Sequence, residues 1–505
     1  MTRGADLLIE TLAANGVDRI FALSGNQIMP IFDACLSAGI RLIHTRHEAA
    51  TVYMAEAHAQ LTGQVGVALV TAGAGFGNAI GALLSAQASD TPVLLLSGDA
   101  PAGQRGRGAF QEMDQCAVAA SVTKATQRAT DPATLAQVAA DLIATAMSGR
   151  PGPVHLALPV DVTTADIPDT PPRTIVPHRT TPIRSQIQTV QSALDRAQNP
   201  LIITGPGLST TRQPTLALPR IAMESPRGLS DPANPGLIAT IGAADLVVAL
   251  GKTVDFTLAL GDPAELGPAS WITVSTDSAL QAQARTNLGD RLIGQMRCDP
   301  AQMAYALTAP ALPRPQTSAI PSPGLNSHSL CTAIQSHIAD LPDTIAICDG
   351  GEFGQWAQAI IRADARVING PSGAIGAGIP YAIAARVARP DATVFAFMGD
   401  GTAGFHLSEF ETAVREGTPF IAIIGNDQRW NAEHLIQARD FGPARQHSCT
   451  LSAARYDQAV AALGGHGEQV SDLTDLDDAI SRAIASNKPA CINVLIDGLP
   501  APTLL

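Results

Sequence analysis

Two acidic residues each follow an apolar segment in the C-terminal third of this 505-residue chain. The run Thr393–Met398 leads into Gly399-Asp400-Gly401, and the run Phe420–Ile424 leads into Gly425-Asn426-Asp427. A helical stretch separates the two runs, which indicates parallel strands joined by a crossover. The carboxyl ends of such strands form the ligand crevice of an open α/β sheet. Carboxylates beside glycines at that edge suit Mg²⁺ carrying a diphosphate, because oxygens ligate the ion and small residues let the backbone approach.

A third acidic residue of interest lies near the N-terminus. Glu48, in the segment Thr45-Arg46-His47-Glu48-Ala49-Ala50, follows the apolar stretch Ile40–Ile43 and opens a helical pattern. Taken alone, it is most simply an acid favoured by the dipole at a helix N-terminus. A carboxyl group that exchanges a proton with a bound molecule is the alternative, and only the accompanying motifs separate the two interpretations.

The elements that must position these residues form three predicted α/β units, each a doubly wound parallel sheet. The first unit covers 1–165, the second 186–310 and the third 326–505. Two Pro-rich linkers, Pro168–Pro182 and Ala309–Pro323, separate them. The first and third units look alike in organisation.

Short apolar runs predict the strands, and the longer periodic segments of the first unit predict helices. The predicted strands are Val65–Val70, Val93–Ser97, Val154–Leu158, Leu201–Thr204, Leu246–Leu250, Trp271–Ser275, Thr344–Cys348, Thr393–Met398, Phe420–Ile424 and Cys491–Ile496. The predicted helices are Ala5–Ala14, Met29–Ala38 and Asn78–Ala88.

Composition narrows the class of partner. The formal net charge of −13 argues against nucleic acid and anionic membranes as ligands. Only 15% of residues are charged, which favours extensive burial between subunits. The seven cysteines form no CxxC pair, so we expect reduced thiols and a cytoplasmic protein. The N-terminal segment lacks a signal-peptide core, and no apolar run reaches membrane-spanning length.

Together the motifs resemble the thiamine diphosphate signature of the acetolactate synthase-like superfamily, which includes pyruvate, benzoylformate and oxalyl-CoA decarboxylases. The resemblance covers almost the whole chain and implies a pyrimidine-binding, a central Rossmann-like and a diphosphate-binding domain. Further matching segments are Ser24–Pro30, Thr71–Asn78, Ala109–Glu112, Gly149–Val162, Asp349–Trp356 and Gly373–Gly376.

The resemblance also implies roles for individual residues. Asp400 and Asp427 supply side-chain oxygens to Mg²⁺, and Arg429 supplies its main-chain carbonyl. Glu48 hydrogen-bonds N1′ of the aminopyrimidine, so that the ring can deprotonate thiazolium C2. With Glu48, the residues implied in catalysis are Gln111 and Asn26, which act on the substrate side. The residues implied in cofactor binding are Gly25, Glu48, Thr71, Gly75, Asn78, Glu352, Phe353, Gly373, Ile375, Gly399, Asp400, Gly401, Thr402 and Asp427.

Departures from the family pattern leave the substrate open. Ser24-Gly25-Asn26 stands where acetolactate synthases usually have Pro-Gly-Gly, and Leu158-Pro159-Val160-Asp161 replaces Leu-Pro-Lys-Asp. We expect a Mg²⁺-dependent C–C lyase or carboligase acting on a 2-oxo acid or acyloin. The alternatives are a 2-hydroxyacyl-CoA lyase or oxalyl-CoA decarboxylase type and a catalytically silent regulatory member.

Other cofactors and partners follow from the same comparison. The chain lacks a well-placed Gly-x-Gly-x-x-Gly with a downstream acid, which argues against a nicotinamide dehydrogenase. Gly205-Pro206-Gly207 is weak evidence for a phosphate site, and we expect no flavin in the middle unit. The expected substrates are small molecules: a 2-oxo acid, an aldehyde or an acyl-CoA. Family members build each active site from two chains, which implies a homodimer or homotetramer.

Overall fold

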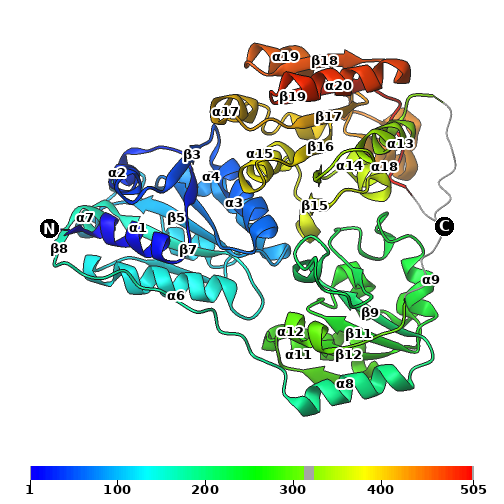
Figure 1. The fold of residues 1–505 in the computed structure, drawn as a ribbon, viewed down its shortest axis with the longest axis horizontal. Helices are drawn as coiled ribbons and strands as arrows, with labels where there is room; N and C mark the ends of the chain where they lie inside the picture. The colour runs from blue at the N-terminus through cyan, green and yellow to red at the C-terminus, as the bar shows by residue number, and fades with distance from the viewer. Residues whose placement is uncertain (1, 312–323, 503–505) are drawn as a thin grey trace. The chain divides into compact units, whose positions relative to one another are not determined.

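A computed structural model describes residues 2–311 and 324–502 of the chain. The strands form three parallel sheets with helices packed against them (Figure 1). Backbone contacts divide the chain into two units, Met1–Arg179 and Thr180–Leu505, and the second unit contains both the central and the C-terminal sheet. Much of the second Pro-rich linker predicted from sequence lies outside the described residues.

The first unit contains a six-stranded sheet in the order β3-β2-β4-β5-β7-β6, with every neighbouring pair parallel. Its strands are β2 (Arg19–Ala22), β3 (Arg41–His44), β4 (Gly66–Val70), β5 (Val93–Asp99), β6 (Ala125–Arg128) and β7 (Val154–Pro159). The helices are α1 (Gly4–Ala14), α2 (Met29–Ala38), α3 (Glu48–Thr62), α4 (Ala74–Ala88), α5 (Gln115–Ala119), α6 (Leu135–Met147) and α7 (Val160–Thr164). A short antiparallel pair, β1 (Thr2–Arg3) with β8 (Asp166–Ile167), closes the unit.

The C-terminal sheet repeats this topology in the order β15-β14-β16-β17-β19-β18. Its strands are β14 (Thr344–Cys348), β15 (Ala365–Ile368), β16 (Thr393–Gly399), β17 (Ile421–Asn426), β18 (His466–Val470) and β19 (Ala490–Leu495). Its helices are α13 (Ser327–Ile338), α14 (Glu352–Ile360), α15 (Gly378–Ala388), α16 (Asp400–Ala403), α17 (Glu409–Glu416), α18 (Asn431–Phe441), α19 (Tyr456–Ala462) and α20 (Leu476–Ser486). Numbered by order along the chain, the strands of both sheets run 2-1-3-4-6-5, so the likeness expected between the first and third units is confirmed.

The central sheet has five parallel strands in the order β10-β9-β11-β12-β13. Its strands are β9 (Pro200–Thr204), β10 (Ile221–Ala222), β11 (Leu246–Leu250), β12 (Ser270–Val274) and β13 (Leu292–Met296). Its helices are α8 (Arg184–Arg196), α9 (Leu237–Gly242), α10 (Pro263–Leu266), α11 (Ser278–Leu288) and α12 (Pro300–Ala306). The predicted fold class, three parallel-sheet α/β domains, is therefore confirmed.

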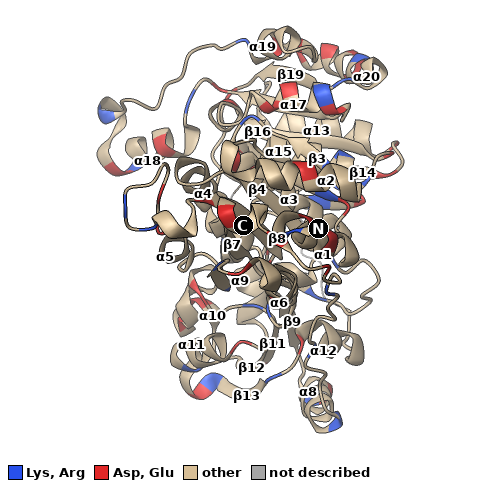
Figure 2. Cartoon of the chain, turned by 90° about the vertical axis from the view of Figure 1, so that its left-hand side faces the viewer, with Lys and Arg blue, Asp and Glu red and all other residues tan. Residues whose placement is uncertain are grey.

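The apolar runs of the sequence become the buried strands. Each strand predicted from sequence begins and ends within two residues of an observed one, and β4, β5, β7 and β11 are buried along their whole length. Strands buried on both faces need a continuous apolar sequence, which is why these strands could be predicted from the sequence. Most of the chain in Figure 2 is tan, in agreement with its charged fraction of 15%. No helix among the described residues is long and apolar enough to cross a membrane.

Each six-stranded sheet reverses its strand order between its first and third strands along the chain. In the first unit this point lies between β2 and β4, and in the C-terminal sheet between β14 and β16. Loops that leave adjacent strands there diverge to opposite faces of the sheet and open a crevice at the carboxyl edge. Gly25 and Thr71 follow β2 and β4, Asp349 and Asp400 follow β14 and β16, and the other predicted site residues lie at or after the ends of these strands or of their neighbours.

Candidate active site

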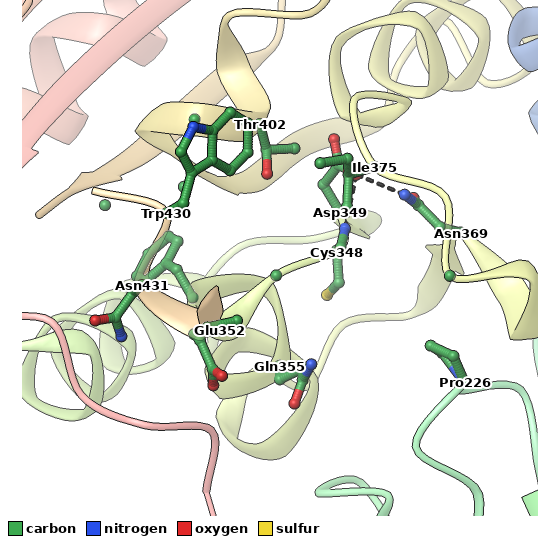
Figure 3. Close-up of a pocket in the computed structure, with 18 of the residues that line it drawn as sticks. Pro226, Cys348, Asp349, Glu352, Gln355, Asn369, Ile375, Thr402, Trp430 and Asn431 are labelled. Carbon is green, nitrogen blue, oxygen red and sulfur yellow. Dashed lines mark hydrogen bonds between the residues drawn. The ribbon is translucent and has the colours of Figure 1, made fainter. Parts of the chain in front are cut away.

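A cavity of about 280 Å³ opens at the carboxyl ends of β14, β16 and β17 (Figure 3). It brings together all the cofactor-binding and metal-binding residues that were expected in the third unit. Those residues are Glu352, Phe353, Gly373, Ile375, Gly399, Asp400, Gly401, Thr402, Asp427 and Arg429. Lining residues that the sequence did not single out as ligands include Asp349, Asn369, Gln355, Gln358, Trp430 and Asn431.

Asp400 and Asp427 are the acidic pair of this cavity. Asp400 is the first residue of α16, directly after β16 ends, and it is almost fully buried. Burial, followed by repulsion from Asp427, raises the pKa of Asp400 to about 7. Burial likewise raises the pKa of Asp427 to about 6. Two carboxylates that repel each other at the end of a buried sheet are a natural site for a divalent cation.

The loop after β17 is held in one conformation by backbone contacts. Gln428 has a φ of 58°, a left-handed conformation that is uncommon outside glycine, and it turns the chain between Asp427 and Arg429. The Leu451 N–H donates to the Gln428 carbonyl at 2.7 Å, and the Trp430 N–H donates to the Cys449 carbonyl at 2.8 Å. These bonds fix Asp427 relative to the neighbouring strand ends.

Gly401 faces the indole ring of Trp430. A Cβ atom added at Gly401 would lie 2.7 Å from Trp430 Cζ3, a distance too short for any contact. Because glycine has no side chain, Gly401 leaves room for the Trp430 ring beside α16. This packing explains why the third position of the Gly-Asp-Gly motif must be a small residue.

Asp349 fastens the loop opposite this acidic pair. Its Oδ1 accepts hydrogen bonds from the N–H groups of Gly350 at 2.7 Å and Gly376 at 3.0 Å, and from Asn369 Nδ2 at 2.6 Å. Its Oδ2 accepts from the Gly378 N–H at 2.7 Å. Burial raises the pKa of Asp349 to about 6, although these four bonds act in the opposite direction. The carboxylate thus sets the path of the segment that carries Gly373 and Ile375.

The segment Asp349–Trp356 resembles the family's loop over the diphosphate, but only part of it is loop in the structure. Only Asp349–Gly351 is loop, because α14 begins at Glu352. Gly351, with a φ of 87°, precedes the helix, and the Phe353 ring packs where a Cβ at Gly425 would lie 2.7 Å from its atoms. Phe353 is therefore part of the wall under β17, whereas Glu352 lies at the cavity itself (Figure 3).

Several buried acceptor oxygens at this cavity lack a donor within the described chain. They are Asp400 Oδ2, Glu352 Oε2, Gln355 Oε1, Gln358 Oε1 and Asn431 Oδ1. A buried acceptor without a donor costs about 1–3 kcal/mol, so such a group signals a missing ligand. A cavity with many hydrogen-bond acceptors favours the binding of a cation and of ligand N–H or O–H groups over the binding of an anion alone.

A segment of the central domain that follows β10 also contributes to this cavity. Ser225 and Pro226 line it, and the preceding residue, Glu224, forms an ion pair with Arg366 at 3.1 Å. Arg366 lies on β15, and its backbone exchanges hydrogen bonds with Thr211 Oγ1 at 2.9 Å. No motif in the sequence indicated that the middle domain would reach this pocket.

In the first unit, Glu48 is the first residue of α3 and follows β3 through a short turn. His47 caps the helix by accepting from the Ala49 N–H at 3.1 Å. Asn78 Nδ2, on α4, donates to Glu48 Oε2 at 3.0 Å. A Cβ at Gly75 would lie 3.3 Å from Glu48 Oε1, so glycine there lets α4 approach the carboxylate.

The remaining predicted residues of the first unit surround this position. Gly25 lies so close to Thr71 that an added Cβ would be 2.3 Å from Thr71 Cβ. Gln111 Oε1 accepts from Gln27 Nε2 at 2.8 Å. Asn26 is exposed and opens the short 3₁₀ turn Asn26–Ile28. The structure thus gathers Glu48, Gly25, Thr71, Gly75, Asn78, Gln111 and Asn26 at the carboxyl edge of one sheet. It adds the hydrogen bonds of Gln27 to Thr71 and Gln111, which the sequence did not predict.

Comparison with known proteins identifies what these two sites belong to. The family model described as "Thiamine pyrophosphate enzyme, N-terminal TPP binding domain" matches residues 2–118, and "Thiamine pyrophosphate enzyme, C-terminal TPP binding domain" matches residues 349–494. The 2-hydroxyacyl-CoA lyase 2 of Bos taurus is 30% identical over 583 residues, covering 98% of this chain and 90% of the relative. The chain belongs to the thiamine pyrophosphate enzymes.

Two further similarities agree with this family. A probable acetolactate synthase of Mycobacterium bovis is 29% identical over 532 residues, covering 97% of this chain and 95% of the relative. The thiamine diphosphate-dependent 4-hydroxybenzoylformate decarboxylase of Rhodococcus jostii has a TM-score of 0.83 at 20% identity, covering 99% of this chain and 100% of that one. At that identity the last similarity supports the fold alone.

The residues of the C-terminal cavity fit the thiamine diphosphate of this family. Its unpartnered acceptors, above all Asp400 Oδ2, face a space lined by small residues that permit close approach of a ligand. Among residues 2–311 and 324–502, no group of three His, Cys, Asp or Glu side chains is arranged to hold a metal ion. A cation bound to Asp400 and Asp427 would therefore need further oxygens from the main chain and from the diphosphate.

Proposed function

We propose that this thiamine pyrophosphate enzyme is a Mg²⁺-dependent lyase or carboligase that breaks or forms a C–C bond next to the carbonyl of a 2-oxo acid or acyloin. The observation that carries the proposal is the pair formed by buried Asp400 and half-buried Asp427, at the carboxyl ends of neighbouring strands and beside an acceptor-rich cavity. Bound thiamine diphosphate supplies a carbon nucleophile and an electron sink.

The C-terminal residues would bind and hold the cofactor. Asp400 and Asp427 provide carboxylate oxygens to Mg²⁺, and Arg429 provides its main-chain carbonyl. Gly399, Gly401 and Thr402, at the start of α16, lie where a diphosphate would meet the ion. Gly373 and Ile375, in the loop fastened by Asp349, line the other side of the cavity and would support the rings.

The first unit would supply the proton chemistry. Glu48 would share a proton with the aminopyrimidine ring, and the Asn78 amide holds one of its oxygens in place at 3.0 Å. Gly25, Thr71 and Gly75 shape the surroundings of this carboxyl group. Asn26 and Gln111 carry carboxamides that could donate to a substrate oxygen as negative charge develops on it.

A 2-hydroxyacyl-CoA lyase is the second candidate. The observation in its favour is the Bos taurus lyase, the relative with 30% identity that aligns with almost the whole chain. The departures in the first loop, at Ser24-Gly25-Asn26, also weaken the acetolactate synthase assignment. A catalytically silent role is opposed by the presence of Glu48, Asp400 and Asp427 in one chain.

A substrate screen of purified protein loaded with thiamine diphosphate and Mg²⁺ tests the two candidates. The panel should contain 2-oxo acids, acyloins and 2-hydroxyacyl-CoA esters, with release of carbon dioxide, aldehyde or acyl-CoA as the readout. Turnover of 2-oxo acids or acyloins supports the first candidate, and turnover confined to CoA esters supports the second. No turnover of any of them by protein that binds the cofactor would refute both.

The assembly we propose is a homodimer or homotetramer, with domains at 1–165, 186–310 and 326–505. The basis for the assembly is the family resemblance and the low charged fraction of 15%. All seven cysteines are unpaired, which supports the expectation of a reducing compartment, the cytoplasm.

A further inference from the structure

Gln27 lies behind Gln111 in a short chain of side-chain hydrogen bonds. Thr71 Oγ1 donates to Gln27 Oε1 at 2.5 Å, and Gln27 Nε2 donates to Gln111 Oε1 at 2.8 Å. The three residues come from the loops after β2, β4 and β5, which meet at the carboxyl edge of the first sheet. Gln27 is 7% exposed, so water does not compete freely for its amide.

The position of Gln27 is fixed by its surroundings. A Cβ added at Gly98 would lie 2.8 Å from Gln27 Cβ, so the glycine at the end of β5 makes room for this side chain. Gln115 Nε2 donates to the Gly98 carbonyl at 2.9 Å, and Gln115 Oε1 accepts from the Gly73 N–H at 3.2 Å. These bonds join the ends of β4 and β5 and hold the wall against which Gln27 rests.

Gln111 is fixed as well. Its φ of 58° is left-handed, and a Cβ added at Gly73 would lie 2.7 Å from its carbonyl oxygen. The neighbouring carboxylate of Glu112 accepts from the N–H groups of Gly108 at 3.0 Å and Ala109 at 3.1 Å. The loop that presents Gln111 is thus ordered by its own contacts before any substrate arrives.

A carboxamide has one accepting end and one donating end, and Gln27 occupies the accepting end of Gln111. No described residue bonds to Gln111 Nε2, which leaves the NH₂ group as the end that Gln111 offers. An NH₂ donor suits a carboxylate or a carbonyl oxygen that gains negative charge, and it does not suit an N–H or O–H group.

We propose that Gln27 is a positioning residue that turns the Gln111 amide so that its NH₂ group donates to an oxygen of the substrate. This role rests on the proposed function and assigns the substrate an acceptor oxygen beside the reacting carbon. It also explains why Gln27 is buried next to Gln111, with both its carbonyl oxygen and its NH₂ group hydrogen-bonded.

Gln27→Glu tests the role because an ionised carboxylate only accepts hydrogen bonds. Glutamate at this position draws the NH₂ group of Gln111 toward itself and turns the Gln111 oxygen toward the substrate. We expect kcat/KM to fall at least about tenfold at pH 8, the equivalent of one hydrogen bond of about 1.4 kcal/mol. Lower pH should restore part of the loss, because a protonated carboxyl group again donates to Gln111.

A double-variant cycle with Gln111→Ala decides whether the effect acts through Gln111. In Gln111→Ala protein, Gln27→Glu should change kcat/KM by less than about twofold. In otherwise wild-type protein, the same substitution should lower kcat/KM about tenfold. Cofactor affinity and hydrogen–deuterium exchange at cofactor C2 serve as controls and should match the wild type in Gln27→Glu.

The outcomes separate the two claims. Wild-type kinetics in Gln27→Glu, or an equal loss in the presence and absence of the Gln111 side chain, overturn the positioning role. Wild-type protein that binds the cofactor but turns over none of the substrates refutes the proposed function, and the positioning role with it. Coupled effects with an intact C2 exchange rate establish the role.

Discussion

Asp349→Asn is the substitution that best separates stability from cofactor binding in this structure. The side chain keeps its size but retains one acceptor oxygen in place of two. With that oxygen at the Oδ1 position it still serves Gly350, Gly376 and Asn369, whereas its NH₂ group faces the Gly378 N–H that was 2.7 Å from Oδ2. One hydrogen bond becomes a contact between two donors, at a cost of about 1–3 kcal/mol.

The loss of the buried charge works in the opposite direction. Burial raises the pKa of Asp349 from 3.8 to about 6, which corresponds to about 3 kcal/mol held against the ionised form. The two effects offset each other, so the free energy of unfolding at pH 7.5 should change by less than about 2 kcal/mol. The loop carrying Gly373 and Ile375 nevertheless loses a fixed point, and thiamine diphosphate should bind at least about tenfold more weakly.

The pH dependence has a defined sign. Because the pKa in the folded state lies above its unfolded value, the group binds its proton more tightly when folded. Its contribution to stability is therefore greatest below about pH 4 and is lost as the pH rises to about 6. Cofactor affinity behaves in the opposite way, because the ionised form holds the loop. The affinity ratio of wild type to Asp349→Asn should fall from about tenfold at pH 7.5 toward one at pH 5.

Isothermal titration calorimetry with thiamine diphosphate and saturating Mg²⁺ measures this ratio, and chemical denaturation measures stability. Asp364→Asn is a matched control, because Asp364 accepts from the Thr344 N–H at 2.8 Å at the opposite end of β14. The control should leave cofactor affinity unchanged. Equal affinities of wild type and Asp349→Asn at pH 7.5, or a ratio that does not change with pH, would refute the reasoning.

Three further predictions concern the two sites. Glu48→Gln should abolish turnover while the cofactor still binds, and cofactor C2 hydrogen–deuterium exchange followed by NMR should slow at least about tenfold; wild-type exchange would contradict the proton role. Gly401→Ala should displace Trp430, since the new Cβ would lie 2.7 Å from its ring, and should shift tryptophan fluorescence and weaken the cofactor; an unchanged spectrum and affinity would contradict that packing. Mixing Glu48→Gln with Asp400→Ala protein should restore activity if each site uses two chains, and no recovery after confirmed subunit exchange would exclude the shared site.

The parts of the fold that the sequence predicted are those whose signal is local. Thr393–Met398 and Leu246–Leu250 are buried on both faces, so their apolar sequence alone marks them as strands. Strands at the sheet edges, such as β6 and β18, are half-exposed and mixed in sequence, and were missed. The Glu352 segment was expected to be a loop because it resembles one in the family, and the helix that begins there has no side-chain cap to mark its start in the sequence.

The residues of the candidate site likewise fall into those that a local sequence pattern indicates and those that depend on contacts made only in the fold. Asp400 was found because glycines flank it at the end of an apolar run, and Asp349 could have been found by a similar rule, because it follows the apolar run Thr344–Cys348 and precedes two glycines. Its function, however, depends on bonds to Gly376 and Gly378, far along the chain. The amide of Gln27 could be noticed in the first loop, but its contacts could not be predicted, because its two partners lie in other loops. Contacts between strand ends, which only the fold creates, account for what was missed.

The central claim is that Asp400 and Asp427 bind Mg²⁺ together with the diphosphate of the cofactor. Calorimetric titration of thiamine diphosphate, with and without Mg²⁺, into wild-type and Asp400→Ala protein tests it most directly. We expect tight binding by the wild type only with Mg²⁺, and a loss of at least about tenfold, or about 1.4 kcal/mol, in the variant. Equal affinity of the two proteins, or wild-type binding that does not depend on Mg²⁺, would contradict the account.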